Sequence, residues 1–299
     1  MHGAIDLGGT KIEAALLNDQ FEILKSQRVA TPADSYENLL AAIELQINWL
    51  KTQSPQQTLN IGIGVPGFVD QQSGIALTSN LPAAGQMLRK DIAARAGQFI
   101  PMDNDCRCFA LSEANGGAGN DFKKVVGLIV GTGIGGGTCV NGKLDNGLNS
   151  LPIEIGHLPI PHRLIESYKL PVLKCGCGRI GCFETLVSGD GMSRLAKHFV
   201  QQIISGEDIV LRAQNGDAAM TKIFEIWLDI YCHMLDVIHL MLDPDCIILG
   251  GGTSKIDNLA QKLTQKFQKL SLKNTKIPTI LTAKYGDSSG VRGAAMLNI

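Results

Sequence analysis

Three of the eight cysteines in this 299-residue chain fall within one short segment, Cys175-Gly-Cys177-Gly-Arg-Ile-Gly-Cys182, and His157 lies upstream of it. Three thiolates and one imidazole form a complete tetrahedral ligand set for Zn²⁺, which favours sulfur and nitrogen donors. Four protein ligands leave no open coordination position on the ion. We therefore expect a structural zinc ion and not a hydrolytic one.

Two alternatives to a metal site stay open for the cysteine cluster, namely three buried thiols or a disulfide. The intervening glycines, Gly176, Gly178 and Gly181, favour metal because they let the backbone turn tightly enough for the sulfur atoms to converge. The remaining five cysteines stand in apolar or helical surroundings and are expected to be free thiols. Together with the lack of a recognisable signal peptide, this predicts a reduced, cytoplasmic protein.

A first glycine turn near the N-terminus could bind phosphate. An apolar strand runs from Gly3 through Asp6 into Gly8-Gly9-Thr10, and a second apolar strand leaves the turn. Glycines expose backbone N–H groups, and the threonine adds a hydroxyl donor, so the turn can hold oxyanions. Asp6 is expected to bind Mg²⁺ through water. The residues predicted to contact ATP here are Asp6, Gly8, Gly9, Thr10 and Lys11.

A second glycine turn follows about 125 residues later. The strand Val125–Val130 runs into Gly131-Thr-Gly-Ile-Gly-Gly-Gly137, and a second strand ends in the hairpin sequence Asn141-Gly142. A third turn, Gly250-Gly251-Gly252, ends a buried strand and is expected to open a helix after Ser254, a natural place for adenosine or phosphate. The residues predicted to contact ATP at these turns are Thr132, Gly133, Gly135, Gly136, Gly251 and Gly252.

The second turn could also have a role different from phosphate binding. The spacing Gly131-x-Gly133-x-x-Gly136 fits the dinucleotide-binding fingerprint, but that fingerprint must open a helix, and this turn enters a strand-like run. No Walker A sequence occurs in the chain. A purely structural hairpin remains as an alternative. We favour a pair of phosphate-binding turns.

The repeated strand–turn–strand pattern predicts an α/β protein built from two βββαβα halves with a cleft between them. In the first half we expect a strand over Glu22–Ala30, a helix over Ser35–Leu50 with Ser35 as its N-cap, and strands over Leu59–Val65 and Phe99–Met102. In the second half, helices are expected over Met192–Gln202, Ile209–Gln214 and Ala218–Leu242. The aromatic and aliphatic side chains of that last helix have core spacing and are expected to pack, not to react.

Acidic and amide side chains cluster at two places. Asp103-Asn104-Asp105 stands where a strand meets a helix, so helix capping is an open alternative for Asp103, and less so for Asp105, which falls inside the first turn. Glu154 precedes His157 and Glu184 follows Cys182. Metal ligation by His157 and Cys182 would place both carboxylates close together.

Composition excludes several partners. The formal net charge is −1 and there is no basic run, which argues against nucleic acid and against an anionic membrane surface. No stretch of 18 apolar residues occurs, so no transmembrane helix is expected. The hydrophobic fraction of 44% is ample for two cores.

These motifs, taken together and in order, resemble the ROK family of bacterial sugar kinases over nearly the whole chain. The motifs that match are Asp6-Leu-Gly-Gly-Thr-Lys11, Asn104-Asp105, Gly131-Thr-Gly-x-Gly-Gly136, Glu154-x-Gly-His157, Cys175-x-Cys-Gly-x-x-Gly-Cys182, Glu184 and Gly250-Gly-Gly252. Within the family, Asp103-Asn-Asp-x-x-Cys-Phe-Ala-Leu-Ser-Glu113 and Asn80-x-Pro-Ala-Ala are most similar to members that phosphorylate N-acetylglucosamine.

The resemblance implies an actin-like, hexokinase-type fold of two lobes that close on the sugar. The small lobe is expected over residues 1–119, completed by a C-terminal helix at 287–299, and the large, zinc-bearing lobe over 120–286. Asp105 is then implied as the general base, and His157 would serve zinc with one ring nitrogen and sugar with the other. The residues implied to bind the sugar are Gly67, Asn80, Asn104, Asp105, Glu154, His157 and Glu184.

The implied reaction is ATP-dependent phosphorylation of N-acetyl-D-glucosamine at its 6-hydroxyl, with Mg²⁺ and a structural Zn²⁺. The small residues Ala83 and Ala84 would leave room for an acetamide group. Glucose, N-acetylmannosamine and fructose stay open as substrates of the same kind of enzyme. The family also contains sugar-responsive repressors with a DNA-binding module before the sugar domain, which is not expected here because the first phosphate strand begins at Gly3. Family members commonly form homodimers, and the same is expected of this chain.

Overall fold

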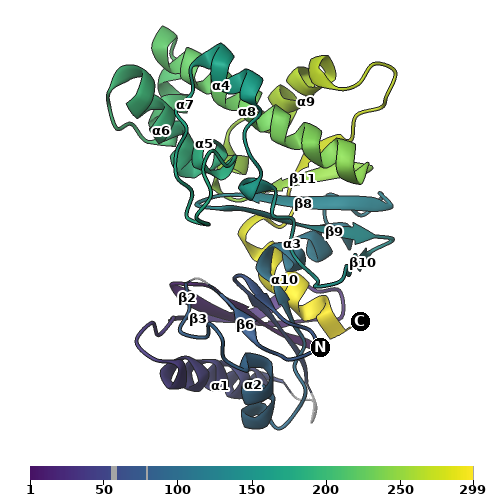
Figure 1. Ribbon diagram of the computed structural model, residues 1–299. Helices are drawn as coiled ribbons and strands as arrows, with labels where there is room; N and C mark the ends of the chain where they lie inside the picture. The colour runs from purple at the N-terminus through teal and green to yellow at the C-terminus, as the bar shows by residue number, and fades with distance from the viewer. Residues whose placement is uncertain (55–58, 79, 299) are drawn as a thin grey trace. The chain divides into compact units, whose positions relative to one another are not determined.

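The computed structural model of the chain describes residues 1–54, 59–78 and 80–298 (Figure 1). Ser79, at the start of the predicted sugar loop, and Ile299, at the end of the predicted C-terminal helix, lie outside the described residues. The chain forms two compact units. The first unit contains Met1–Asn120, Gly137–Pro152 and Lys284–Ile299, and the second contains Asp121–Gly136 and Ile153–Ala283.

The first sheet has five strands in the order β3-β2-β1-β4-β7. Strands β1 to β3 form an antiparallel meander, whereas β4 and β7 continue the sheet parallel to β1. The bounds of these strands are β1 (His2–Leu7), β2 (Lys11–Leu17), β3 (Ile23–Ala30), β4 (Asn60–Val65) and β7 (Met102–Asn104). A separate two-stranded sheet pairs β5 (Phe68–Val69) with β6 (Ala76–Leu77).

The second sheet repeats this topology in the order β10-β9-β8-β11-β12. Strands β9 and β10 are antiparallel, whereas β8, β11 and β12 run parallel to one another. The bounds are β8 (Lys124–Val130), β9 (Ile134–Val140), β10 (Lys143–Leu144), β11 (Cys246–Gly250) and β12 (Thr279–Thr282). The equal strand orders confirm the predicted internal duplication of an α/β half.

The helices of the first unit cover both faces of its sheet, with α1 and α2 on one side and α3 and α10 on the other (Figure 1). The bounds are α1 (Tyr36–Gln53), α2 (Leu88–Ala96), α3 (Asp105–Ala114) and α10 (Ser289–Ala295). Ser35 accepts a hydrogen bond from the N–H of Asn38, which confirms the predicted N-cap of α1. The described part of the predicted C-terminal helix is α10 between two short 3₁₀ turns.

Small residues let α10 pack closely. A Cβ atom at Gly293 would lie 1.8 Å from the carbonyl oxygen of Cys108 in α3, and one at Gly62 would lie 2.0 Å from the carbonyl oxygen of Ala294. No side chain fits at either place, so these glycines are required by packing.

Glu113, near the end of α3, holds the final segment of the chain against that helix. Its carboxylate is fully buried and accepts hydrogen bonds from the backbone N–H groups of Ala118, Lys284 and Tyr285 and from the hydroxyl of Ser289. Such donors satisfy a buried carboxylate without a direct ion pair. The C-terminal end of α3 is therefore fixed.

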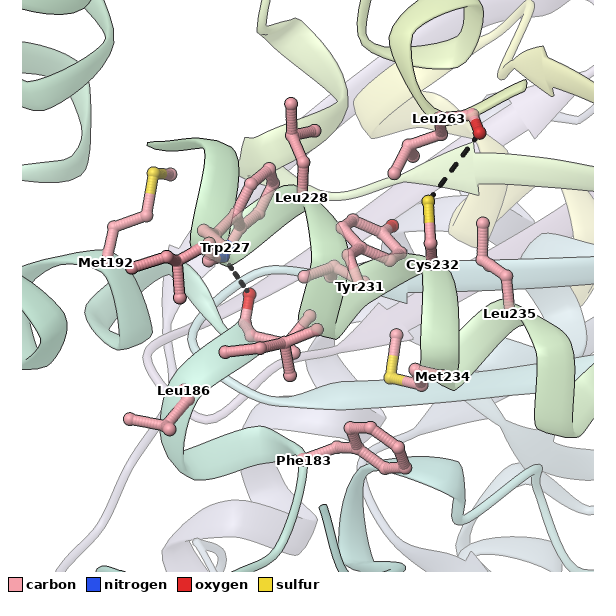
Figure 2. Packing of buried hydrophobic residues seen from close by; sticks show 14 of the residues in the cluster. Phe183, Leu186, Met192, Trp227, Leu228, Tyr231, Cys232, Met234, Leu235 and Leu263 are labelled. Carbon is pink, nitrogen blue, oxygen red and sulfur yellow. Dashed lines mark hydrogen bonds between the residues drawn. The ribbon is translucent and has the colours of Figure 1, made fainter. Parts of the chain in front are cut away.

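In the second unit, helices gather on one side of β8 and β11 (Figure 1). They are α4 (His162–Tyr168), α5 (Glu184–Val187), α6 (Gly189–Val200), α7 (Gly206–Gln214), α8 (Ala218–Leu242) and α9 (Leu259–Leu270). Figure 2 shows the core beneath α8, in which Trp227 and Tyr231 are buried as predicted. The indole N–H of Trp227 donates a 3.0 Å hydrogen bond to the carbonyl of Val187, which ties α5 to α8.

Several predicted boundaries are wrong. The strand predicted over Phe99–Met102 is displaced along the chain: β7 begins only at Met102 and runs to Asn104, because these three residues pair with β4. The second glycine turn ends at Gly133, and β9 already begins at Ile134. A 3₁₀ turn, Gly252–Lys255, follows the third glycine turn, so the helix predicted after Ser254 begins only at Leu259.

Residues 137–152 pack with the first unit, whereas the sequence-based division placed 120–286 together. Within the described residues, no helix is both long enough and apolar enough to cross a lipid bilayer.

Candidate active site

The carboxyl ends of the three parallel strands of the first unit gather several predicted site residues. Asp6 lies next to the end of β1, Gly67 follows β4 by two residues, and Asn104 ends β7. Asp105 is the first residue of α3. Because β1, β4 and β7 are parallel neighbours, these residues share one edge of the sheet, which is where α/β proteins bind ligands.

Asn104 fixes the start of α3. Its side-chain oxygen accepts hydrogen bonds from the N–H groups of Cys106 (2.9 Å) and Arg107 (3.2 Å), which makes Asn104 the N-cap. Its amide nitrogen donates to the carbonyl of Gly67 at 2.6 Å. Asp103 is therefore not the cap, and its carboxylate instead pairs with Arg107 at 2.7 Å.

Asp105 and Asp6 form a pair of interacting acids. Burial raises the pKa of Asp105 above its ordinary value, although the N–H of Cys106 donates to the carboxylate at 2.8 Å. The pKa of Asp6 rises to about 7, first because of burial and next because of the charges of Asp105 and Glu13. A fold that keeps two carboxylates together at this cost is typical of a reactive or cation-binding site.

The first glycine turn lies beside this pair. Gly9, Thr10 and Lys11 are exposed, and the N–H of Gly8 closes the turn on the carbonyl of Lys11 at 2.9 Å. A Cβ atom at Gly9 would lie 3.5 Å from the Cβ of Asn80. The predicted sugar residue Asn80 thus stands next to the predicted phosphate turn.

The second glycine turn, in the second unit, is held by backbone hydrogen bonds. The N–H of Gly131 donates to the carbonyl of Gly133 (2.9 Å), and the N–H of Gly189 donates to the carbonyl of Gly131 (2.7 Å). Thr132 and Gly133 are exposed at its tip. Gly135 and Gly136 lie inside β9, and Gly136 must be small because a Cβ atom there would lie 2.6 Å from the carbonyl oxygen of Gly127. Their predicted contact with ATP stays a prediction.

The third glycine turn meets the second at the carboxyl ends of β8 and β11, which are parallel neighbours. Gly251 has a φ of 80° and sits against Val130, so only glycine fits. A cavity of about 910 Å³ opens here, large enough for a nucleotide. Residues of both turns and of the neighbouring helices line it, among them Gly131, Thr132, Gly189, Gly252, Thr253 and Lys255.

The four predicted metal ligands lie together in the second unit. One ligand atom from each of His157, Cys175, Cys177 and Cys182 lies within 4.8 Å of the others. Two sulfur ligands about 2.3 Å from a tetrahedral zinc ion would be about 3.8 Å apart, and a sulfur and a nitrogen ligand about 3.6 Å apart. The Cys177 and Cys182 sulfurs are 3.8 Å apart, and the Cys175 sulfur is 3.6 Å from Nδ1 of His157.

The loop that carries the cysteines depends on glycine at two positions. Gly178 has a φ of 90° and Gly181 a φ of 73°, conformations that other residues rarely adopt. All eight cysteines are reduced thiols, and a sulfur separation of 3.8 Å is far longer than the roughly 2.05 Å of a disulfide. The disulfide alternative therefore does not hold in this structure, and the donor set fits a tetrahedral zinc site.

Two carboxylates flank His157, as predicted. Oε2 of Glu154 lies 3.6 Å from Nε2 of the imidazole, and Oε1 of Glu184 lies 3.9 Å from Nδ1. The other oxygen of Glu184 accepts a 2.9 Å hydrogen bond from the N–H of Ile134, the residue that follows the second glycine turn. Glu184 thus links the cysteine loop to that turn.

The predicted site residues divide between the two units. Asp6, the first glycine turn, Gly67, Asn80 and Asn104-Asp105 belong to the first unit. The second and third glycine turns, Glu154, Glu184 and the metal ligands belong to the second. The structure brings each set together within its own unit.

Some contributors to the site carry no motif of their own in the sequence. Arg107 pairs with Asp103 in the buried first turn of α3, and the only sign of this in the sequence is a cation close behind three polar residues. Ala83, predicted to leave room beside the sugar, is fully buried in the core of the first unit. Its small size is therefore explained by packing, and Ala84 alone is exposed.

Comparison with known proteins decides the family. The sequence model of the family described as "ROK family" matches residues 2–299 of this chain. The chain belongs to the ROK family. Among curated ROK relatives, it is 38% identical over 302 aligned residues to the N-acetyl-D-glucosamine kinase of Photobacterium profundum, with 100% of this chain and 99% of the relative covered.

Solved structures of ROK proteins share the fold. The ROK hexokinase from Thermus thermophilus superposes with a TM-score of 0.87 at 26% identity, covering 99% of this chain and 97% of that one. The ROK family glucokinase from Streptomyces griseus, in complex with glucose and AMPPNP, gives a TM-score of 0.79 at 26% identity, covering 99% and 98%. The fold is therefore the actin-like, duplicated α/β fold of ROK hexokinases.

Proposed function

We propose that this ROK protein is a sugar kinase that transfers the γ-phosphoryl group of ATP to the 6-hydroxyl of N-acetyl-D-glucosamine. The observation that carries the proposal is full-length similarity at 38% identity to a relative named N-acetyl-D-glucosamine kinase. The acid pair of Asp6 and Asp105, beside an exposed glycine turn, supports the same chemistry.

In the proposed reaction, Asp105 accepts the proton of the sugar 6-hydroxyl while that oxygen attacks the γ-phosphorus. A new P–O bond forms to the sugar, and the bond from the γ-phosphorus to the ADP oxygen breaks. Phosphoryl transfer depends mostly on positioning and on charge stabilisation. A raised pKa suits Asp105 because a general base works best when its pKa approaches the pH of the reaction.

The exposed glycine turns would bind the polyphosphate through backbone N–H groups and the hydroxyls of Thr10 and Thr132. Asp6 would hold Mg²⁺ through water, and the ion, when bound, neutralises charge on the β- and γ-phosphates. The cavity beside Gly252 and Lys255 has the size that the rest of a nucleotide needs.

His157, Cys175, Cys177 and Cys182 would hold a structural zinc ion, which would fix the fold of the cysteine loop. Nδ1 of His157 faces the sulfur of Cys175 and would ligate the metal. Nε2 then remains for a sugar hydroxyl, beside Glu154. Glu154, His157 and Glu184, together with Gly67, Asn80 and Asn104 of the first unit, are the proposed sugar ligands.

Substrate preference tests the proposal. We expect kcat/KM to be highest for N-acetylglucosamine when it is compared with N-acetylmannosamine, glucose and fructose in a coupled assay of ADP release. A pocket whose polar groups bond the acetamide leaves them unpaired with glucose, so discrimination against glucose of roughly 10⁴–10⁵-fold is expected. Equal or higher kcat/KM for glucose would assign the chain to another substrate.

The pH dependence of the reaction should reflect Asp105. The base must be ionised, so kcat/KM falls as the pH drops through its pKa. Because burial raises that pKa, the acid limb is expected above pH 3.8, the ordinary value for aspartate. The measurement is the pH profile of kcat/KM at saturating Mg²⁺. A profile with no acid limb above pH 3.8 would contradict this assignment, after the protein is shown to stay folded over that range.

We propose that the protein is cytoplasmic, which agrees with its reduced cysteines. We also propose that it forms a homodimer, as members of the family commonly do. We propose that the protein has no nucleic-acid partner, because its formal net charge is −1 and binding to a phosphate backbone depends on positive charge.

A further inference from the structure

A buried cation occupies an unfavourable position at the start of α3. Arg107 is only 2% exposed and is the third residue of the helix, in its first turn. The helix dipole disfavours a positive charge there, and removing a guanidinium from water costs several kcal/mol unless it is fully paired. Residues that break local preferences in this way are typical of functional positions.

The guanidinium makes three contacts that join separate parts of the first unit. Its Nε donates to the carboxylate of Asp103 in β7 at 2.7 Å. One terminal nitrogen donates to the carbonyl of Asp145 at 3.0 Å, and the other donates to the side-chain oxygen of Asn146. Arg107 therefore ties β7 and the first turn of α3 to the loop that follows β10.

These contacts continue to the neighbours of Asp105. The oxygen of Asp103 that pairs with Arg107 also accepts the N–H of Asn104 at 2.7 Å. Asn104 in turn caps α3 and bonds the carbonyl of Gly67. The residues on both sides of Asp105 are thus fixed by one hydrogen-bonded network that passes through the guanidinium.

Close packing leaves this network no room to shift. A Cβ atom at Gly137 in β9 would lie 2.7 Å from the Cα of Arg107 and 3.2 Å from the carbonyl oxygen of Cys106. The backbone of β9 therefore presses directly on the first turn of α3.

We propose that Arg107 is a positioning residue that sets the orientation of Asp105 toward the sugar hydroxyl. The inference rests on the proposed kinase function, in which Asp105 is the base. It goes further, because it assigns the precision of that base to a residue that touches neither substrate. A displacement of about 1 Å in a reacting group can cost about 10²-fold in rate.

The test compares two variants with a matched control. Arg107→Met removes the guanidinium and leaves Asp103 unpaired, and Arg107→Met combined with Asp103→Asn removes both charges. Replacing a buried ion pair by neutral groups usually restores stability. We expect the double variant to unfold near the wild-type temperature yet to keep a kcat about 10²-fold lower, with KM for both substrates changed less than about threefold. Arg95→Met, which removes a cation that pairs with Glu37 and Glu44 in the same unit, should leave kcat unchanged.

A purely structural role makes the opposite prediction. If the double variant regains both stability and kcat, Arg107 only serves the packing of α3 and the inference is wrong. Amide hydrogen exchange gives a second readout that needs no reaction, because loss of positioning should speed exchange at the backbone N–H groups of Cys106 and of position 107, a methionine in the double variant. Unchanged exchange there would also overturn the inference. A wild-type protein that phosphorylates no sugar would contradict the proposed function instead, and the exchange result would still decide on Arg107.

Discussion

Asp105→Asn is expected to lower kcat by about 10²–10⁴-fold, the usual contribution of a general base. The amide has nearly the shape of the carboxylate and can still accept the hydrogen bond from the N–H of Cys106. It cannot take the proton of the sugar hydroxyl at neutral pH. KM for sugar and ATP should change little, because the lost interaction belongs to the chemical step.

The same variant should be at least as stable as the wild type. An acid whose pKa is raised in the folded state opposes folding at any pH above its ordinary pKa, and that cost is complete above the raised value. The neutral amide carries no such cost at pH 8. Thermal unfolding at pH 8 beside steady-state kinetics therefore separates a lost base from a lost fold.

A matched control makes the same chemical change elsewhere. Asp208 is an exposed aspartate in the first turn of α7, so Asp208→Asn should leave kcat within about twofold of the wild type. If Asp105→Asn turns over at a similar rate while folded, Asp105 is not the base. A raised KM for sugar with an unchanged kcat would point instead to a role of Asp105 in sugar binding alone.

Loss of the metal is the second change with a large expected effect. Structural zinc contributes on the order of 10 kcal/mol in small peptides, and less of that is expected in a unit with its own large core. A net loss of about 3 kcal/mol would lower the unfolding midpoint by about 6–12 °C. Cys175→Ser should therefore purify with far less than one zinc per chain, melt lower and bind N-acetylglucosamine weakly.

The effect on sugar binding follows from the contacts of the cluster. His157 and Glu184 are both proposed sugar ligands. Nδ1 of His157 and Oε1 of Glu184 each lie 3.6 Å from the sulfur of Cys175, and these two atoms are 3.9 Å apart. When the cysteine loop loosens, their positions are lost together. Calorimetry of sugar binding, with zinc content measured by mass spectrometry, tests this directly.

Cys232→Ser is the matched control for Cys175→Ser, because it makes the same chemical change at a cysteine outside the metal cluster. Cys232 is buried in α8 of the same unit, and its thiol bonds the carbonyl of Leu263 outside the cluster (Figure 2). This variant should keep one zinc per chain and its sugar affinity, whatever happens to its stability. Wild-type sugar affinity in the zinc-depleted Cys175→Ser variant would contradict the proposed role of the metal.

Much of the fold was predictable because its signals are local. Alternating and helical apolar patterns predicted the duplicated α/β halves, and Ser35 marked the start of α1. The Asn141-Gly142 hairpin was also predictable, since both residues need a positive φ, and they have φ values of 51° and 74°. The cysteine spacing predicted the cluster that the structure brings together.

The rest depends on contacts between distant residues. Gly136 looked like part of a turn, yet it is a strand residue kept small by Gly127 in the neighbouring strand. The hydrogen bond from Ile134 to Glu184 joins residues 50 positions apart, and Arg107 meets Asn146 across 39 positions. Neither pair leaves a local pattern in the sequence, so neither contact could be predicted without the three-dimensional structure.

One measurement tests the central claim most directly. The purified protein is incubated with ATP, Mg²⁺ and N-acetylglucosamine, and the product is examined by ¹H–³¹P correlation NMR. The account predicts one new phosphate ester whose phosphorus couples to the two protons on C6 of the sugar, and an initial rate of ester formation by Asp105→Asn that is lower by about 10²–10⁴-fold. A phosphorus coupled to the anomeric proton, or ADP formed without any sugar ester, would contradict it.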